Sequence, residues 1–257
     1  MDLGLQGERA LVLGGTAGLG LACASRLSDA GVRVIINGRD RTRGEAAVRA
    51  LPQGELVVAD IGREDERRAL IEAVTGIGAP SIIVTNAGGP PPGQFEEIDS
   101  SAWRAAFETN VLAALEIVRA FLPAMKSRRF GRVINITSFV VKESYPNMSL
   151  SNSLRVALTG AMSSIAREVA PFGITVNGML PGLMDTGALE RVIRDRARRD
   201  GISEAEAKVR MAASVPMQRL GTAGDFGALC AFLASPLASY VTGQNICVDG
   251  GLTRSVI

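Results

Sequence analysis

The strongest constraint on the fold is the alternation of short apolar runs with longer segments of helical period. Seven runs are rich in β-branched and aliphatic residues: Ala10 to Leu13, Val32 to Ile36, Leu56 to Val58, Ile82 to Val84, Val133 to Ile136, Ile174 to Val176 and Ile246 to Val248. Segments with helical spacing and few breakers lie between them: Leu19 to Ala30, Glu64 to Thr75, Ala102 to Met125, Ser153 to Ala170 and Asp225 to Ala234. A helix between two strands returns the chain so that the strands run parallel. The pattern predicts a doubly wound α/β fold around a seven-stranded parallel sheet.

No Pro/Ser-rich linker or internal repeat divides the 257 residues. We therefore expect a single domain over residues 1–257, with a less regular insertion at residues 187–214. This insertion is expected to cover a substrate site, because it carries apolar residues on a segment outside the strand pattern. The alternative is that these residues pack two ordinary helices together.

Histidine is absent from the chain, and this excludes many enzyme classes. Without histidine there is no Ser-His or Cys-His nucleophile, no histidine-ligated zinc and no histidine proton shuttle. No metal site is expected. The formal charge is only +2, from 28 basic and 26 acidic side chains, which gives nucleic-acid binding no support. We expect the partner to be a small-molecule substrate.

The chain carries no visible signal for export or for a membrane. No stretch of about 18 apolar residues occurs, and the first residues lack a basic region followed by an apolar core. The three cysteines, Cys23, Cys230 and Cys247, are far apart in apolar stretches, as expected of reduced thiols. A cytoplasmic protein without a membrane partner is expected.

A glycine-rich turn follows the first predicted strand. It reads Gly14-Gly15-Thr16-Ala17-Gly18-Leu19-Gly20 and opens the first predicted helix. Glycines in this context allow a tight turn, let the backbone approach a pyrophosphate and permit close packing of strand and helix. The phosphate then meets the N-terminus of the helix. Gly14, Thr16, Gly18, Leu19 and Gly20 are therefore predicted to bind a dinucleotide, as in a Rossmann-type domain.

The ends of the next three predicted strands carry further candidates for the cofactor site. The second strand ends Asn37-Gly38-Arg39. This end has no carboxylate to accept hydrogen bonds from a ribose, and its arginine is placed to bind a phosphate, which favours NADP over NAD. The alternative is that Arg39 is merely exposed. Asp60-Ile61 is predicted to hold the adenine amino group, and Asn86-Ala87-Gly88-Gly89 to pass close to a ribose, since ligands bind at the carboxyl ends of such strands.

Together with these residues, later motifs resemble the short-chain dehydrogenase/reductase family nearly from end to end. They are Asn110, Ile134-Asn135-Ile136-Thr137-Ser138, Asn177, Pro181-Gly182 with Thr186, and Tyr240-Val241-Thr242-Gly243-Gln244 to Val248-Asp249-Gly250-Gly251. The resemblance implies a homotetramer or homodimer. It also implies that Asn110 supports a proton-relay water, that Ser138 orients a substrate carbonyl, and that Pro181-Gly182 and Thr186 touch the nicotinamide. Asn135 and Asn177 are interpreted as structural.

The chain departs from the family where a Tyr-x-x-x-Lys pair is expected. About thirteen residues after Ser138 it reads Ser151-Asn152-Ser153-Leu154-Arg155, so serine stands in the tyrosine position and arginine in the lysine position. The family tyrosine exchanges a proton as hydride moves, with its pKa of about 10 lowered by the lysine. Serine has no comparable acidity, and arginine cannot exchange a proton near neutral pH. Arg155 can still hold the nicotinamide ribose.

Tyr145 is an alternative proton donor, since a loop can direct its side chain into a cleft. Asp185, Glu143 and Lys142 are weaker candidates for this role. The competing interpretation of Tyr145 is a surface or substrate-wall aromatic. A further set of residues is expected to form an apolar pocket for a moderately hydrophobic small molecule: Phe95, Phe139, Tyr145, Met148 and Met184.

Three functions remain open at this stage. The first is an NADP-dependent oxidoreductase that reduces a carbonyl or oxidises an alcohol with an unconventional proton source. The second is a non-redox enzyme on the same scaffold, such as an isomerase, dehydratase or cyclase, in which Ser138, Ser151 and Arg155 bind an anion or enolate. The third is a regulatory subunit that binds the cofactor without turnover. The first is favoured by the resemblance.

Overall fold

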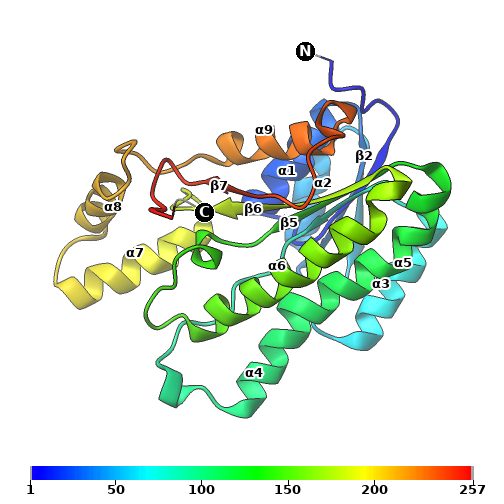
Figure 1. The fold of residues 1–257 in the computed structure, drawn as a ribbon. Helices are drawn as coiled ribbons and strands as arrows, with labels where there is room; N and C mark the ends of the chain where they lie inside the picture. Colours follow the sequence, from blue (N-terminus) through cyan, green and yellow to red (C-terminus); the bar gives the residue numbers. More distant parts are fainter. Residues whose placement is uncertain (1, 256–257) are drawn as a thin grey trace.

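A computed structural model describes residues 2–255 and contains one seven-stranded sheet (Figure 1). The strands are β1 (Arg9–Val12), β2 (Arg33–Gly38), β3 (Gly54–Val58), β4 (Ile82–Thr85), β5 (Gly131–Ile136), β6 (Ile174–Pro181) and β7 (Asn245–Val248). Their order across the sheet is β3-β2-β1-β4-β5-β6-β7, and every neighbouring pair is parallel. The predicted doubly wound fold with a seven-stranded parallel sheet is confirmed.

Helices cover both faces of this sheet (Figure 1). They are α1 (Gly18–Asp29), α2 (Arg41–Arg49), α3 (Glu64–Ile77), α4 (Ser100–Phe107), α5 (Ala113–Arg128), α6 (Ser149–Val169), α7 (Gly187–Asp200), α8 (Glu204–Ala213) and α9 (Ala223–Ala234). Successive strand residues point to opposite faces. Leu11 and Val133 thus join a core with α3, α5 and α6, whereas Val12 and Ile134 join a core with α1 and α9.

The carboxyl ends of β1 and β4 mark the point where the order of the sheet reverses. β1 pairs with β2 on one side and with β4 on the other, so the connections after β1 and β4 leave toward opposite faces. Ligands of open α/β sheets bind in the crevice at such a point. The glycine turn and Asn86 both lie there.

One long helix predicted from the sequence is interrupted. The segment from Ala102 to Met125 forms α4 and α5, joined by a π-helical turn at Glu108–Leu112. Within this turn the Asn110 side chain donates to the Ala106 carbonyl oxygen at 3.0 Å. In a regular α-helix that carbonyl would accept from the backbone N–H of residue 110. The Asn110 side chain competes with the backbone for this carbonyl oxygen. Because the interruption depends on this one polar contact, the apolar periodicity of the segment did not reveal it.

The insertion expected at residues 187–214 forms α7 and α8. These helices have their own small apolar cluster, which includes Leu189, Ile193 and Met211. They project beside the carboxyl end of the sheet (Figure 1). No helix within residues 2–255 has the length and apolar character needed to cross a membrane.

Candidate active site

The glycine turn after β1 places the start of α1 at the crevice. Gly14 and Gly18 adopt φ values of 58° and 55°, a left-handed conformation that favours glycine. α1 begins after Ala17, whose side chain offers no cap to the first N–H groups of the helix. These N–H groups therefore remain available to an anion, and the helix dipole favours negative charge at the same point.

Close backbone packing explains why Gly20 must lack a side chain. A Cβ at Gly20 would lie 2.2 Å from the Gly14 carbonyl oxygen. The same oxygen accepts a hydrogen bond at 3.3 Å from the Nδ2 atom of Asn86, at the end of β4. The glycine turn and the end of β4 are thereby held together across the crevice.

Arg39 and Asp60 come together at the ends of β2 and β3. The Arg39 Nη1 atom lies 3.6 Å from the Asp60 Oδ2 atom, with 75% of the Arg39 side chain exposed. The Thr16 side chain packs over Gly38, where a Cβ would approach it within 2.5 Å. Asn37 instead turns inward and donates to the carbonyl oxygens of Val57 and Ala59. An exposed cation thus stands beside the glycine turn, and no carboxylate occupies the end of β2.

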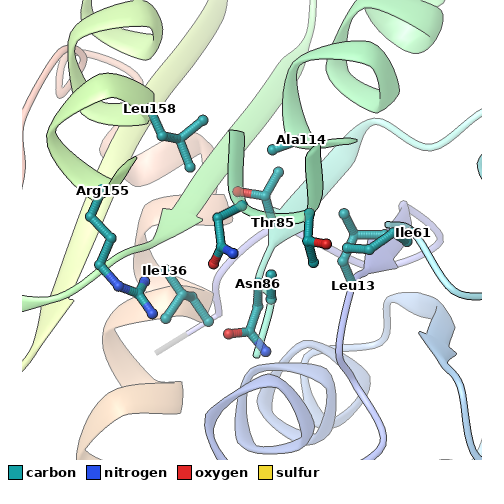
Figure 2. Close-up of a pocket in the computed structure, with 11 residues that line it drawn as sticks. Leu13, Ile61, Thr85, Asn86, Ala114, Ile136, Arg155 and Leu158 are labelled. Carbon is teal, nitrogen blue, oxygen red and sulfur yellow. The ribbon is translucent and has the colours of Figure 1, made fainter. Parts of the chain in front are cut away.

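A small cavity lies between the ends of β1, β4 and β5 and the helices α5 and α6 (Figure 2). Its lining consists of Leu13, Ile61, Thr85, Asn86, Ala87, Thr109, Asn110, Ala114, Ile136, Arg155 and Leu158. Ile61, Asn86, Ala87, Asn110 and Arg155 were among the predicted site residues. Thr85 and Thr109 were missed, because a single threonine in an apolar segment carries no signal in the sequence.

Arg155 extends from α6 into this cavity, and its guanidinium contacts a residue of the same helix and the segment that follows β5 (Figure 2). Its Nε atom donates to the Ser151 hydroxyl at 3.1 Å, and its Nη1 atom donates to the Thr137 carbonyl oxygen at 2.6 Å. Ser151 is buried, one helical turn before Arg155. Burial lowers the pKa of Arg155 to about 10, and among the described residues no carboxylate forms an ion pair with it. The guanidinium is a charged group without an acidic partner at neutral pH.

The π-helical turn is fixed by a buried arginine that sequence reasoning missed. Arg67 is 1% exposed and donates to Glu108 at 2.7 Å and to Glu116 at 2.6 Å. It also donates to the Ile61 carbonyl oxygen at 2.7 Å. Arg67 thus ties the segment after β3 to the turn that carries Asn110. Nothing in the local sequence distinguishes it from the exposed arginines.

Other predicted residues follow the strands β4, β5 and β6. The Ser138 hydroxyl accepts from the Val140 N–H at 3.4 Å at the end of β5. Gly182 lies against Asp249, because a Cβ added at Gly182 would come within 2.6 Å of the Asp249 Cβ. The Gly182 N–H donates to the Val248 carbonyl oxygen. Thr186 precedes α7, and its Cβ would lie 3.9 Å from a Cβ built at Gly18. A Cβ at Gly88 would meet only open space.

Tyr145 lies outside the residues that line the cavity. Its ring packs edge-on against Phe139, with ring centroids 5.3 Å apart, and 45% of the residue is exposed. Asn152 on α6 holds the Tyr145 backbone with hydrogen bonds to its carbonyl oxygen and N–H. Asp185 pairs with Lys208 of α8 at 2.9 Å. The loop therefore has a defined conformation in which the Tyr145 ring faces Phe139.

The expected apolar pocket is only partly assembled. Phe139 is buried and contacts Tyr145, whereas Phe95 is 73% exposed. Met184 is 4% exposed and joins the core formed with α1 and α9. Gly93 forms a β-bridge with Met148, so the segments after β4 and before α6 are linked. Met184 thus serves packing, and the expectation that all five residues share one pocket is not supported by these positions.

Comparison with known proteins places this arrangement in a family. A family model described as enoyl-(acyl carrier protein) reductase matches residues 14–253. The NADPH-dependent reductase BacG of Bacillus subtilis is 30% identical over 96% of this chain and 98% of its own length. The 3-oxoacyl-[acyl-carrier-protein] reductase FabG of Haemophilus influenzae is 34% identical over 98% of this chain and 100% of its own.

Solved structures agree with these relatives. The NADPH-dependent reductase YwfH, involved in bacilysin biosynthesis, has a TM-score of 0.92 and 28% identity over 98% of this chain and 100% of that one. L-sorbose reductase of Gluconobacter frateurii, solved with NADPH and L-sorbose, has a TM-score of 0.94 and 26% identity over 100% of both chains. The present chain therefore belongs to the short-chain dehydrogenase/reductase family.

Proposed function

We propose that the protein is an NADP-dependent oxidoreductase that reduces a carbonyl, or oxidises an alcohol, of a small and moderately hydrophobic substrate. Relatives that align over nearly the whole chain are NADPH-dependent reductases. The observation that carries the proposal is the glycine turn at the start of α1, where Gly20 approaches the Gly14 carbonyl too closely for any side chain. Such a turn matches the requirements of a dinucleotide pyrophosphate.

The described residues fit NADP better than NAD. Arg39 is exposed beside the glycine turn, where it is suited to bind a 2′-phosphate, and its ion pair with Asp60 is weak at 3.6 Å. Asp60 and Ile61, which follow β3, are proposed to hold the adenine, and Asn86 to Gly88, which follow β4, to pass close to a ribose. Pro181, Gly182 and Thr186 are proposed to touch the nicotinamide. Bound NADPH would supply the hydride.

Ser151 and Arg155 are proposed to occupy the positions of the family Tyr-Lys pair. Supporting this are the spacing from Ser138 and the hydrogen bond from Arg155 to the Ser151 hydroxyl. Because that oxygen already accepts from Arg155, its own hydrogen is free to be donated to a substrate oxygen. Arg155 would stabilise negative charge that develops on this oxygen. Ser138 would orient the substrate, and Asn110 would hold a water.

The source of the proton is then a water, with Tyr145 as the alternative donor. Serine is too weak an acid to replace tyrosine by itself, and Arg155 stays protonated near neutral pH. A water held near Ser151 and Arg155 can transfer a proton through the serine hydroxyl. Tyr145 would have to leave its contact with Phe139 to reach the cavity.

The proposal also covers the insertion, the oligomeric state and the location of the protein. The insertion at residues 187–214 is proposed to cover the substrate, since α7 starts directly after Thr186 and next to Gly18. A homotetramer or homodimer is proposed from family membership. A cytoplasmic location is proposed from the composition of the chain.

The test is titration with NADPH and NADH, followed by a panel of carbonyl substrates monitored by loss of nicotinamide absorbance. Tighter NADPH binding with turnover supports the proposal, and Arg39→Ala should weaken NADPH binding more than NADH binding. Binding without turnover would instead favour the non-redox or regulatory alternatives. The double substitution Ser151→Tyr with Arg155→Lys should create or raise reductase activity, and its failure in a folded protein would contradict the placement of the pair.

A further inference from the structure

A row of three polar residues and one glycine crosses four strands on the face of the sheet covered by α6. The strand register pairs Thr85 of β4 with Asn135 of β5, Asn135 with Gly178 of β6, and Gly178 with Asn245 of β7. The neighbouring residues on this face, such as Val133 and Val176, belong to the apolar core. Buried polar groups among apolar ones destabilise the fold unless each is hydrogen-bonded.

Asn135 lies at the centre of this row with half of its amide unsatisfied. It is 2% exposed, and its Oδ1 atom accepts a hydrogen bond from the Thr85 hydroxyl at 2.6 Å. Its Nδ2 atom is buried and has no hydrogen-bond partner within residues 2–255. Since a hydroxyl can donate or accept, turning the amide by half a rotation only exchanges which of its two atoms lacks a partner.

A second unsatisfied group faces the row from α6. Ser151, Arg155, Thr159 and Ser163 follow one another at intervals of four residues, so they form one polar stripe along the helix. The first two contact each other at the active site. Thr159 lies one turn further, and its buried hydroxyl has no hydrogen-bond partner in the described part of the chain.

Both unsatisfied groups line a single small cavity between α6, the strands β5 and β6, and the segment that leads into β7. Other polar residues in its wall are Ser163, Asn177, Gln244 and Asn245. The absence of a side chain at Gly178 leaves room for Asn245, whose Oδ1 atom would lie only 2.2 Å from a Cβ there. The cavity of about 10 Å³ is close to what one water molecule needs.

We propose that this cavity is a binding site for one ordered water, held by the Asn135 amide and the Thr159 hydroxyl. A donor and an acceptor on opposite walls suit a water, which both accepts and donates, whereas an ion would find no charged group among the lining residues. The water fixes the Asn135 amide so that its other atom bonds Thr85. Thr85 precedes Asn86 and lines the active-site cavity. Asn135 is thus a positioning residue that acts on the cofactor site through Thr85.

The test compares Thr159→Val with Ser164→Ala, a control on the exposed face of the same helix. A crystal structure of the wild-type protein at high resolution should show one water bonded to Asn135 and Thr159, and the Thr159→Val structure should lack it. NADPH dissociation constants should rise about two- to tenfold in Thr159→Val, the range for one hydrogen bond, and stay unchanged in Ser164→Ala. Thr85→Val should weaken NADPH binding to a similar extent. Thr85→Ser retains the hydroxyl and should therefore bind NADPH more tightly than Thr85→Val.

An empty wild-type cavity, or one closed by its side chains, would overturn the water site. A water that disappears in Thr159→Val while NADPH binding remains at the wild-type level would overturn the positioning role. Only the NADPH measurement rests on the proposed function. If the protein bound no NADPH, the crystal structures would still decide whether the water site exists.

Discussion

Replacement of Arg155 by methionine should stabilise the ligand-free protein while weakening its active site. Arg155 is a largely buried cation without an acidic partner among the described residues, and desolvation lowers its pKa to about 10. Each pKa unit by which the folded protein lowers this value corresponds to about 1.4 kcal/mol, so the charge of Arg155 destabilises the fold by about 3 kcal/mol. This shift disfavours the charged form in the folded state, and the penalty therefore applies at every pH below about 10.

Loss of hydrogen bonds opposes this gain. The Thr137 carbonyl oxygen and the Ser151 hydroxyl would each lose the arginine as a donor. Losses of about 0.5 to 1 kcal/mol for each leave a net stabilisation of about 1 to 2 kcal/mol. In a domain of this size, a gain of that order raises the melting temperature by roughly 2 to 8 °C.

The assay is urea unfolding of wild type, Arg155→Met and Arg155→Lys, with and without NADPH. Arg155→Lys retains a buried cation and should gain no stability, and Arg191→Met, on the exposed side of α7, should leave stability within about 0.5 kcal/mol of wild type. NADPH should stabilise wild type more than Arg155→Met. If Arg155→Met unfolds more easily than wild type without ligand, the reasoning about an uncompensated buried charge is refuted.

Three further substitutions test other parts of the structure. Arg67→Met should lower the free energy of unfolding by about 3 kcal/mol, because Glu108 and Glu116 lose their buried cationic partner. Denaturant unfolding measures this free energy, and a decrease below about 1 kcal/mol would contradict the prediction. Gly20→Ala should weaken NADPH binding at least tenfold, measured by fluorescence titration, since its Cβ meets backbone 2.2 Å away; unchanged affinity would argue against the cradle. Asp225→Asn should destabilise α9 by about 1 kcal/mol near neutral pH. Hydrogen bonds from Arg219 and Thr222 lower the pKa of Asp225 to about 2. The stabilisation of the fold by the ionised carboxylate is therefore complete above about pH 4 and is lost as the pH falls toward 2. Thermal melts across this range should show that the difference in melting temperature between variant and wild type disappears at low pH.

Apolar periodicity predicted the strands because each run is buried on both faces by helices. The run from Val133 to Ile136, for example, sends alternate side chains into the two cores, and the structure places it in β5 at the middle of the sheet. Helix α2 was missed because Arg41 to Arg49 is mainly polar and buries little beyond Gly44 and Ala47. The π-helical turn was missed because it depends on one side-chain contact of Asn110.

The candidate site could be predicted where it depends on backbone conformation or on motif spacing. Gly14, Gly18 and Gly20 could be predicted as a turn because only glycine suits the positive φ of the first two and the close approach of the third. Thr85 and Arg67 could not be found, because their importance arises from contacts with residues 50 and 49 positions away. Such contacts appear only once the chain has folded.

We propose that this chain transfers hydride with Ser151 and Arg155 in the positions of the family tyrosine and lysine. The most direct test of this proposal is incubation with NADPH carrying deuterium at the transferable position, a carbonyl panel and mass spectrometry of the products. We expect one deuterium in the alcohol for each NADPH oxidised, with a lower rate in Arg155→Met. Saturable NADPH binding with no deuterium in any product would contradict it.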